Sequence, residues 1–403
     1  MRILFVGIAA SIHAARWVRQ LDGLGWDLHF FNGAPEWGTT LHPVFPRITY
    51  HGLKPAALPR MLVRKAAQRE PFRKHYERLF GQAKLLARAI RKVRPDIIHS
   101  LAIQQGGYPV LDALHMLKGP RPRWIVTNYG SDIYLFGRLP EHVERVKAVL
   151  RECDFYTCET QRDLALAYAF GLRGVPLGPI VPNAGGYNLA AAASLRQVPP
   201  SNRRTIAIKG YQHLYGRAFV ALRAIERCAD VLRDYTIRIY SASRPDVEVV
   251  ARMLAERTGL NIEVMPYGCD HEEMLRLHGS ARMSISLSIS DGACTSLLEA
   301  MLMGAYPIQS CTAAADEWIE DGVTGSIVHP DDPESVEAAI RRAVADDTLV
   351  DRAAIVNWKT AQTRLDDRMI REHAISWYRQ VGNNAHDLGT QTFNPGQVTH
   401  EAA

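Results

Sequence analysis

Short apolar segments alternate along the chain with longer segments of mixed apolar and polar residues. The short segments have the length and β-branched content of buried strands, and the longer ones follow the period of amphipathic helices. In the first half this pattern predicts strands at residues 3–7, 27–32, 97–101, 124–129, 155–159 and 180–182. It also predicts helices over residues 13–24, 60–93, 142–151 and 161–170. Such a βα rhythm is typical of a parallel sheet covered by helices.

The rhythm breaks near the middle of the chain and then restarts. Residues 183–202 are rich in small and polar side chains and include Pro199 and Pro200, which indicates a linker. Beyond it the pattern predicts strands at 205–210, 236–241, 262–266, 283–288, 306–310 and 326–328. It predicts helices over 217–228, 247–258, 271–278, 333–345 and 366–381. Two such series predict two doubly wound, Rossmann-like α/β domains that face a cleft, where the carboxyl ends of their strands bind ligands.

These breaks define a domain map. We expect a first domain over residues 1–185, a linker over 186–203 and a second domain over 204–365. A C-terminal helix over 366–382 is expected to cross back to the first domain. The polar, aperiodic residues 383–403 predict a flexible tail.

Composition limits the class of protein. The chain has 403 residues, of which 47% are hydrophobic and 22% charged, as in soluble globular proteins of two domains. Its six cysteines form no CxxC pair and no Cys/His cluster, so we expect free thiols and no metal site. The opening MRILFVGIAAS fits a first strand better than a signal peptide, and no apolar run is long enough to span a membrane. These features predict a cytoplasmic protein.

Basic residues are concentrated between Arg60 and Arg94, where twelve Lys and Arg residues occur with only Glu70 and Glu77 as acids. A segment of such one-sided charge predicts an anionic partner, such as the inner face of a membrane bound peripherally. The alternative interpretation is a solvated helix face. Nucleic acid is disfavoured as a partner, because no nucleic-acid-binding motif accompanies the segment.

The residues from Ser290 to Gly304 carry the clearest candidate chemistry. They follow an expected strand, open with Asp291 and Gly292, and continue as a strong helix former that contains Glu299. The first N–H groups of such a helix, at Gly292 to Cys294, form a natural anion site. Glu299 is flanked by apolar residues and needs hydrogen-bond partners, which a ribose diol would supply. A helix cap for Asp291 and a structural acceptor for Glu299 are the alternatives.

Two cations lie near the start of the second domain. Lys209 ends its first expected strand, and Arg217 begins the helix that follows. Gly210 and Gly216 lie between them and allow close approach of the backbone. Two cations at a strand end suit a diphosphate that must leave with its charge neutralised. An exposed Lys and Arg beside a loop is the alternative.

The first domain offers two polar loops at strand ends. The first includes Ser11 and His13 and lacks the GxGxxG pattern of nicotinamide-binding folds. The second includes Tyr129, Ser131 and Asp132 and could hold hydroxyl groups of a sugar. His99 lies within an apolar strand, which favours a buried histidine of the core.

Together these residues resemble the retaining nucleotide-sugar glycosyltransferases of the GT-B fold, specifically the large glycosyltransferase family 4. The resemblance covers roughly residues 1–380. Asp291 and Glu299, within SDGACTSLLEAMLMGAYPIQS, match the family's E-x7-E motif. The segment EWIEDGVTGSIVHPDDPESVEAAI is similar to the turn and helix that follow in the family. The segments SIHAARWVRQL, PDIIHS, GSDI and VPNAG also resemble family counterparts in the same order.

The resemblance implies transfer of a sugar from a nucleotide-diphosphate sugar to a glycan or lipid-linked acceptor in cell-surface polysaccharide biosynthesis. Configuration would be retained, and neither a metal nor a cofactor would be bound, the donor being a substrate. The catalytic set would be Lys209 and Arg217 at the diphosphate and Asp291 near the sugar hydroxyls, with Glu299 binding the ribose. Other donor contacts would come from the two loops of the second domain, at Gly210, Gly292, Ala293, Cys294 and Thr295. The acceptor or sugar side would be Ser11, His13, Tyr129, Ser131 and Asp132 of the first domain.

The chain departs from the family pattern at three points. Asp291 stands where the family has Glu, and Asn128 or Tyr129 stands where many members have His. Lys209 precedes Arg217, which differs from the common G-R-x4-K-G form. Two alternatives to the transferase stay open: a non-catalytic glycan- or nucleotide-binding scaffold on a degenerate transferase fold, and a sugar-nucleotide epimerase or a glycogen-type phosphorylase on a similar fold.

Overall fold

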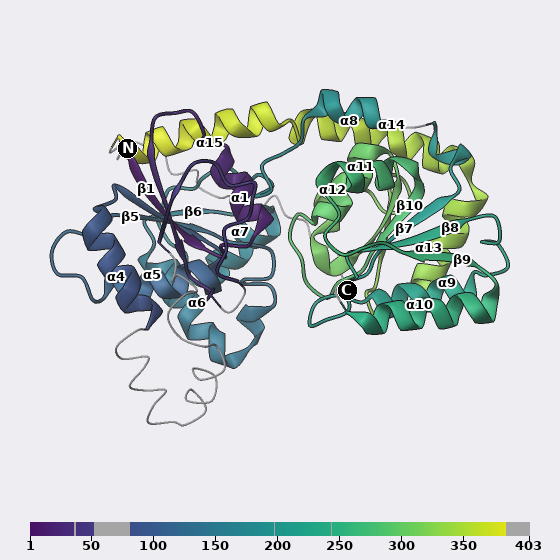
Figure 1. The fold of residues 1–403 in the computed structure, drawn as a ribbon, viewed down its shortest axis with the longest axis horizontal. Coiled ribbons are helices and arrows are strands. Elements are labelled where there is room, and N and C mark those ends of the chain that lie inside the picture. The colour runs from purple at the N-terminus through teal and green to yellow at the C-terminus, as the bar shows by residue number, and fades with distance from the viewer. Residues whose placement is uncertain (36–37, 52–80, 197, 243, 384–403) are drawn as a thin grey trace. The chain divides into compact units, whose positions relative to one another are not determined.

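The computed structural model describes residues 1–35, 38–51, 81–196, 198–242 and 244–383. These residues form two compact units. Unit 1 comprises Met1–Cys158, Leu164–Ile180 and the chain from Glu372 onward, and unit 2 comprises Glu159–Asp163 and Val181–Arg371. Figure 1 shows one sheet in each unit, with helices around it.

Unit 1 is built on a six-stranded parallel sheet in the order β3-β2-β1-β4-β5-β6. Its strands are β1 (Arg2–Gly7), β2 (Asp27–Asn32), β3 (Thr49–His51), β4 (Ile97–Leu101), β5 (Arg123–Thr127) and β6 (Phe155–Thr157). Its helices are α1 (Ile12–Arg19), α4 (Gln82–Val93), α5 (Tyr108–Leu114), α6 (Pro140–Glu152) and most of α7 (Gln161–Ala169). A π-helical turn, η2 (Ile103–Gly107), follows β4.

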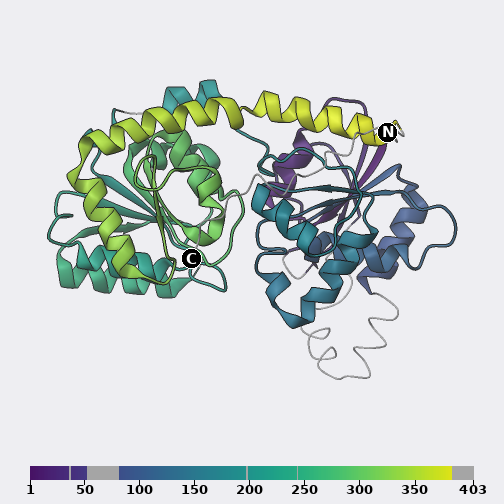
Figure 2. The same cartoon turned by 180° about the vertical axis from the view of Figure 1, so that it is seen from behind.

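Unit 2 repeats this architecture with the order β12-β11-β10-β7-β8-β9, again all parallel. Its strands are β7 (Thr205–Lys209), β8 (Thr236–Tyr240), β9 (Asn261–Val264), β10 (Ala281–Ser286), β11 (Tyr306–Ser310) and β12 (Ser326–Val328). Its helices are α8 (Leu189–Leu195), α9 (Ala218–Arg227), α10 (Pro245–Thr258), α11 (His271–Ser280), α12 (Thr295–Met303), α13 (Pro333–Ala345) and α14 (Asp347–Arg364). The last helix, α15 (Asp367–Gly382), begins in unit 2 and ends in unit 1. Figure 2 shows α14 and α15 along their length.

Each sheet is buried between two layers of helices, which explains why its strands are apolar on both faces. In unit 2, α9, α10 and α13 pack together on one side, and α8, α11, α12 and α14 pack together on the other (Figure 1). Every residue of β10 is buried, and so are eight of the nine residues of α12, from Ser296 to Met303. Apolar burial on this scale, at about 25 cal/mol per Å² removed from water, fixes the position of α12 against β10.

His99 lies in β4 and is fully buried in the core of unit 1. Its Nδ1 is hydrogen-bonded to the Tyr378 hydroxyl of α15, and its Nε2 lies 2.6 Å from Thr127 Oγ1. Burial lowers the pKa of His99 to about 3, so the ring is neutral. The expectation of a core histidine is therefore confirmed, and His99 ties α15 to the sheet.

The sequence pattern located most elements. Strands were expected at the observed bounds for β2, β4, β11 and β12, and the other predicted strands, except 180–182, differ by one or two residues at their ends. No strand forms at residues 180–182, which follow Pro179 and end at Pro182, because proline cannot donate to a ladder. The predicted helix over 60–93 is described only from Gln82, and residues 52–80 and 384–403 lie outside the described part of the chain.

Four elements were missed: β3, α5, α8 and α14. The sequence of α8 is LAAAASL and the buried face of α14 is Val350, Ala353, Ala354, Asn357 and Ala361, so small residues replace the large apolar stripe that signals a helix. Before α5, Gly106 and Gly107 resemble a loop, although Pro109 occupies the first turn, where proline is tolerated. The expected linker 186–203 lies in unit 2 and contains α8.

Candidate functional site

The strand order of unit 2 reverses direction between β7 and β10, which are hydrogen-bonded neighbours. At such a switch point the loops after the two strands diverge, which leaves a crevice at their carboxyl ends where open α/β sheets bind ligands. Lys209 is the last residue of β7, and the segment 287–294 follows β10. The residues that the sequence singled out in the second half therefore meet at this edge of the sheet.

The Lys209 ammonium group is surrounded by side chains from the loop after β7 and the loop after β10. Its Nζ lies 3.9 Å from Asp291 Oδ2, 3.8 Å from Cys294 Sγ and 4.6 Å from the centre of the Tyr211 ring. Burial alone would lower the pKa of Lys209, but the Cys294 sulfur and the Asp291 carboxylate more than offset burial, so its pKa is raised. The side chain is 14% exposed and stays protonated, so it offers a fixed positive charge at the crevice.

The loop from Tyr211 to Arg217 folds back onto the segment after β10. Arg217 N donates to Leu287 O at 3.0 Å, and Ile289 N donates to Tyr215 O at 2.8 Å. Gly216 is required there, because a Cβ would lie 2.3 Å from Tyr211 O. Gly210 packs closely against β8, because a Cβ would lie 2.9 Å from Tyr240 O, and its role at the donor stays a prediction.

Arg217 immediately precedes α9, and its charge is engaged. Its Nε donates to Asp331 Oδ1 at 2.6 Å, and Asp331 is half exposed. Burial, followed by the positive charges of Lys209 and Arg217, lowers the pKa of His213 in the same loop. The two cations therefore act on one region, and Arg217 shares its charge with Asp331 through Nε only, so other donors of the guanidinium remain for a ligand.

Asp291 lies in the loop between β10 and α12 and does not cap the helix. Its Oδ1 accepts from Gly292 N at 2.9 Å, whereas the N-cap residue of α12 is Cys294, with no side-chain capping hydrogen bond. The N–H groups of the first turn of α12 are thus oriented for an anion rather than satisfied by a cap. Gly292, Ala293 and Cys294 are buried and Thr295 is half-buried, so these residues present backbone rather than long side chains.

Arg162, which the sequence did not single out, holds this loop in place. Its Nη2 donates to Asp291 O at 2.6 Å and its Nη1 donates to Thr312 O at 3.0 Å. Its Nη2 also lies 2.9 Å from Asp163 Oδ1. Asp163 is fully buried, and burial raises its pKa to about 6, against the opposing effect of Arg162. Arg162 therefore joins the β10–α12 loop to a buried carboxylate.

Glu299 lies inside α12 with a side chain 7% exposed, as its apolar neighbours predicted. Its partners include two histidines of α11: His271 Nε2 lies 3.1 Å from Oε1, and His278 Nε2 lies 3.7 Å from Oε2. His278 is fully buried, which lowers its pKa, and it packs edge-on against Tyr240. His271 is 45% exposed and stacks on Tyr187, so it forms the outer wall of the Glu299 site.

Neither histidine was predicted from the sequence, although the spacing of the two carried a signal. Residues 271 and 278 are seven apart in a predicted helix, which places them on one face. What the sequence could not supply is that this face packs against α12 at Glu299. Arg162 gave no signal, because its partners are backbone oxygens distant in the sequence.

The loops of unit 1 also lie at the carboxyl ends of their strands. Ser11 is the N-cap of α1, and its Oγ accepts from Ala14 N at 3.3 Å. Asp132 is 4% exposed, and its Oδ2 accepts from Ile103 N at 2.7 Å and Tyr129 N at 3.0 Å. Asp132 therefore ties the loop after β5 to the turn after β4. His13, Tyr129 and Ser131 are half-buried in these loops, and their role at an acceptor stays a prediction.

The described residues bear on whether the protein holds a metal ion or crosses a membrane. They contain no group of three His, Cys, Asp or Glu side chains that could hold a metal ion. Metal-independence and the absence of a cofactor nevertheless stay predictions. No helix in the described ranges combines the length and apolar character needed to cross a bilayer.

Comparison with known families matches both units to glycosyltransferase models. Residues 2–159 match the model described as glycosyl transferase 4-like, and residues 225–357 match glycosyl transferases group 1. The second match includes the β10–α12 loop and α11, and the first includes the loops of Ser11 and Asp132. No curated protein sequence matches the chain significantly.

Solved structures share the fold across nearly the whole chain at low sequence identity. Sucrose-phosphate synthase from Thermosynechococcus elongatus is 16% identical with a TM-score of 0.68, covering 94% of this chain and 99% of its own. The UDP-forming α,α-trehalose-phosphate synthase from Burkholderia xenovorans, in complex with glucose 6-phosphate, is 15% identical with a TM-score of 0.69, with the same coverage. Anabaena HepE in complex with UDP-glucose is 13% identical with a TM-score of 0.65, covering 94% and 100%.

Replacement of Arg162 by Ala should destabilise unit 2, because Asp163 loses its counter-charge. We expect the free energy of unfolding to fall by about 2–3 kcal/mol. Removing one partner of a fully buried ion pair costs about 3–5 kcal/mol, and the loss is smaller here because Arg162 is partly exposed. The folded pKa of Asp163 lies above its ordinary value, so its ionisation opposes folding as pH rises. The loss, measured by urea unfolding, should therefore be larger at pH 8 than at pH 5.

The double variant Arg162→Ala, Asp163→Asn is the matched control. It removes the buried carboxylate together with the arginine, so it should recover part of the stability and show little difference between the two pH values. Equal losses for the single and double variants at both pH values would contradict the role of this pair.

Proposed function

We propose that this chain is a retaining glycosyltransferase. Its two family matches and its fold support the coarser class, a glycosyltransferase of the GT-B fold. It takes a sugar from a nucleotide-diphosphate sugar and passes it to a glycan or lipid-linked acceptor, in a family-4-type reaction of cell-surface polysaccharide biosynthesis. Unit 2 binds the donor and unit 1 binds the acceptor. The observation that carries this proposal is the grouping of Lys209, Asp291 and the uncapped start of α12 at the switch point of unit 2.

The chemistry of that grouping suits a departing diphosphate. Lys209 keeps its proton and supplies a positive charge, and the first N–H groups of α12 supply oriented dipoles. Charge that develops on the leaving group as the sugar–oxygen bond breaks is stabilised by donors already in place. Asp291, held by Gly292 N and Arg162, is positioned to accept from a sugar hydroxyl.

Glu299 supports the nucleoside end of the donor in this proposal. Its carboxylate is nearly buried, and its neighbour His271 is 45% exposed, so a ribose diol would approach Glu299 from the side of His271. Glu299 and Lys209 are attached to neighbouring elements, α12 and β7, which pack through β10. A rigid frame of this kind fixes the spacing between ribose and diphosphate sites.

Two further parts of the proposal follow from charge. Lys209, Arg217 and the helix start take the role that a divalent cation plays in other transferases, so the reaction proceeds without a metal. The basic segment from Arg60 to Arg94, of which α4 contributes Lys84, Arg88, Arg91 and Lys92, holds the enzyme peripherally on anionic lipid. Metal-independence is supported by the cations in unit 2, and membrane binding is supported by the basic composition of the segment from Arg60 to Arg94.

Replacement of Lys209 by Ala should lower kcat at least about tenfold, because one leaving-group contact worth a few kcal/mol is lost. The measurement is turnover of a sugar donor, with release of nucleoside diphosphate as the readout. Lys359 is an exposed lysine of α14 in the same unit, and Lys359→Ala is the matched control that should retain normal turnover. Unchanged turnover in Lys209→Ala would contradict the proposed role.

Replacement of His271 by Ala should raise the donor KM about 3–10-fold and leave kcat nearly unchanged, because Glu299 loses the hydrogen bond that orients it toward the ribose. Inhibition by a nucleoside diphosphate and by its 2′,3′-dideoxy analogue separates this effect from general damage. The variant should weaken binding of the ribonucleotide and leave the dideoxy analogue unaffected, and His271→Gln, which keeps a donor, should restore part of the affinity. An equal loss for both ligands would show that His271 does not act through the ribose.

A further inference from the structure

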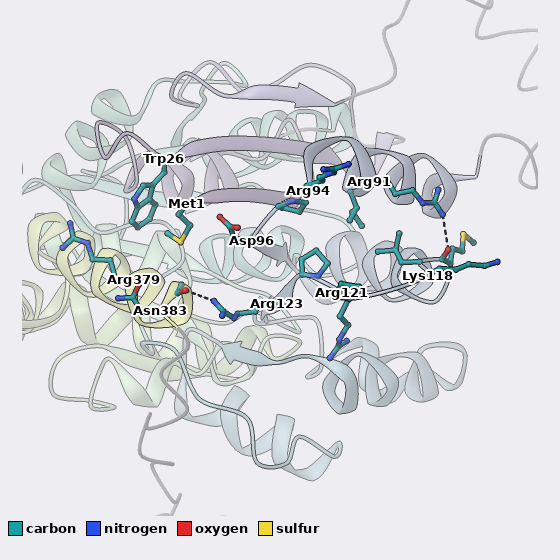
Figure 3. Close-up of a pocket in the computed structure, with 17 residues that line it drawn as sticks. Met1, Trp26, Arg91, Arg94, Asp96, Lys118, Arg121, Arg123, Arg379 and Asn383 are labelled. Atoms are coloured by element: carbon teal, nitrogen blue, oxygen red, sulfur yellow. Dashed lines mark hydrogen bonds between the residues drawn. The ribbon is translucent and has the colours of Figure 1, made fainter.

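A cavity of about 1180 Å³ opens at the opposite edge of the sheet in unit 1, away from the loops described above. Its walls come from the start of β1, the end of α4, the residues before β4 and β5, and the last turn of α15. Figure 3 shows these side chains around the hollow. Ligands of parallel sheets bind at the carboxyl edge, so this amino-edge cavity belongs to neither candidate substrate site.

The lining of the cavity is strongly basic. It contains six cationic side chains and one acid, Asp96 (Figure 3); the cations are Arg91, Arg94, Lys118, Arg121, Arg123 and Arg379. The carboxylate of Asp96 is already used, because its Oδ2 accepts from Arg2 N at 2.7 Å. Several like charges around one hollow repel one another and produce a focused positive potential, which an anionic ligand would relieve.

Three of these cations are held by the protein. Arg123 Nη1 donates to Val381 O at 2.6 Å and to Gly382 O at 2.8 Å, and Arg121 Nη2 donates to Asp154 Oδ1 at 2.7 Å. Arg91 Nη2 donates to Met116 O at 3.2 Å. A guanidinium has five N–H donors, so each of the three retains donors for a ligand while its position is fixed.

The side chains of the other three cations, Arg94, Lys118 and Arg379, form no hydrogen bond or ion pair with the residues that the structure describes, and all three are exposed. The cavity therefore has guanidinium donors in fixed positions on its wall and exposed cations at its rim. This arrangement suits phosphate, because one guanidinium can bind two phosphate oxygens at once. Trp26 is half-buried beside Met1 at one end of the cavity and offers the flat apolar surface that a base or sugar ring would cover.

We propose that this cavity is a second ligand site, for a soluble molecule that carries two or more phosphate groups on a sugar or nucleoside. A concave site suits a soluble ligand better than a bilayer, which would reach the exposed rim but not half-buried Arg123. The proposal does not depend on the function proposed for unit 2. A ligand between Arg123 and Arg379 would also hold the last turn of α15 against the start of β5.

The test is calorimetric titration of the full-length protein with sodium tripolyphosphate as the probe, in a Lys209→Ala background that weakens phosphate binding at unit 2. The double variant Arg94→Ser, Arg379→Ser removes two unpaired cations from the cavity. The matched control, Arg233→Ser and Arg352→Ser, removes two exposed arginines of unit 2 that also form no hydrogen bond or ion pair with described residues. Unchanged thermal unfolding of both variants without ligand establishes that they fold.

We expect one tripolyphosphate per chain, at least tenfold weaker binding in the cavity variant, and unchanged binding in the control. Equal weakening in both variants would mean diffuse attraction by net charge and would overturn the site, as would the absence of binding. A parallel sedimentation with phosphatidylglycerol vesicles distinguishes the source of phosphate. Loss of vesicle binding in the cavity variant, without tripolyphosphate binding in the parent, would overturn a soluble ligand in favour of a membrane contact.

Discussion

The candidate site depends on one constraint of the second sheet, the pairing of β7 with β10. These parallel strands are neighbours, so the residue that ends β7 and the loop that follows β10 meet at one edge. This pairing brings Lys209 within 3.9 Å of Asp291 and places the start of α12 beside both. Because β10 and α12 are buried, the charged groups at their ends are held by a core that they do not themselves stabilise.

Three acids lie around this site, of which Asp163 and Glu299 are buried and Asp291 is partly exposed, and each has different partners. Asp163 has an arginine beside it, Glu299 has two histidines, and Asp291 has a backbone N–H and a lysine. Unpaired carboxylates at the depth of Asp163 and Glu299 would be costly, so we expect the partners of these two acids to contribute to stability. Substitutions here therefore need separate measurements of stability and of ligand affinity.

The sequence predicted the two parallel sheets, with most strands within two residues of their observed bounds, because these follow from apolar periodicity. It placed Lys209 and Asp291 at strand ends of one domain, but the contact between them depends on the strand order, which no local pattern records. It did not predict α14, whose buried face is mostly alanine, or the engagement of Arg217 by Asp331. Arg162 and His271 were also missed. Their importance comes from side chains that meet across elements distant in the chain, and no local pattern records such contacts.

The central claim is that the switch point of unit 2 binds a nucleoside diphosphate without a metal. The most direct measurement is the thermal unfolding of the purified protein with a panel of nucleoside diphosphates, each with and without EDTA. The account predicts that one base's diphosphate raises the melting temperature, that EDTA leaves the shift unchanged, and that Glu299→Gln reduces it. No shift with any nucleotide would contradict the donor site, and a shift abolished by EDTA would contradict its independence of metal.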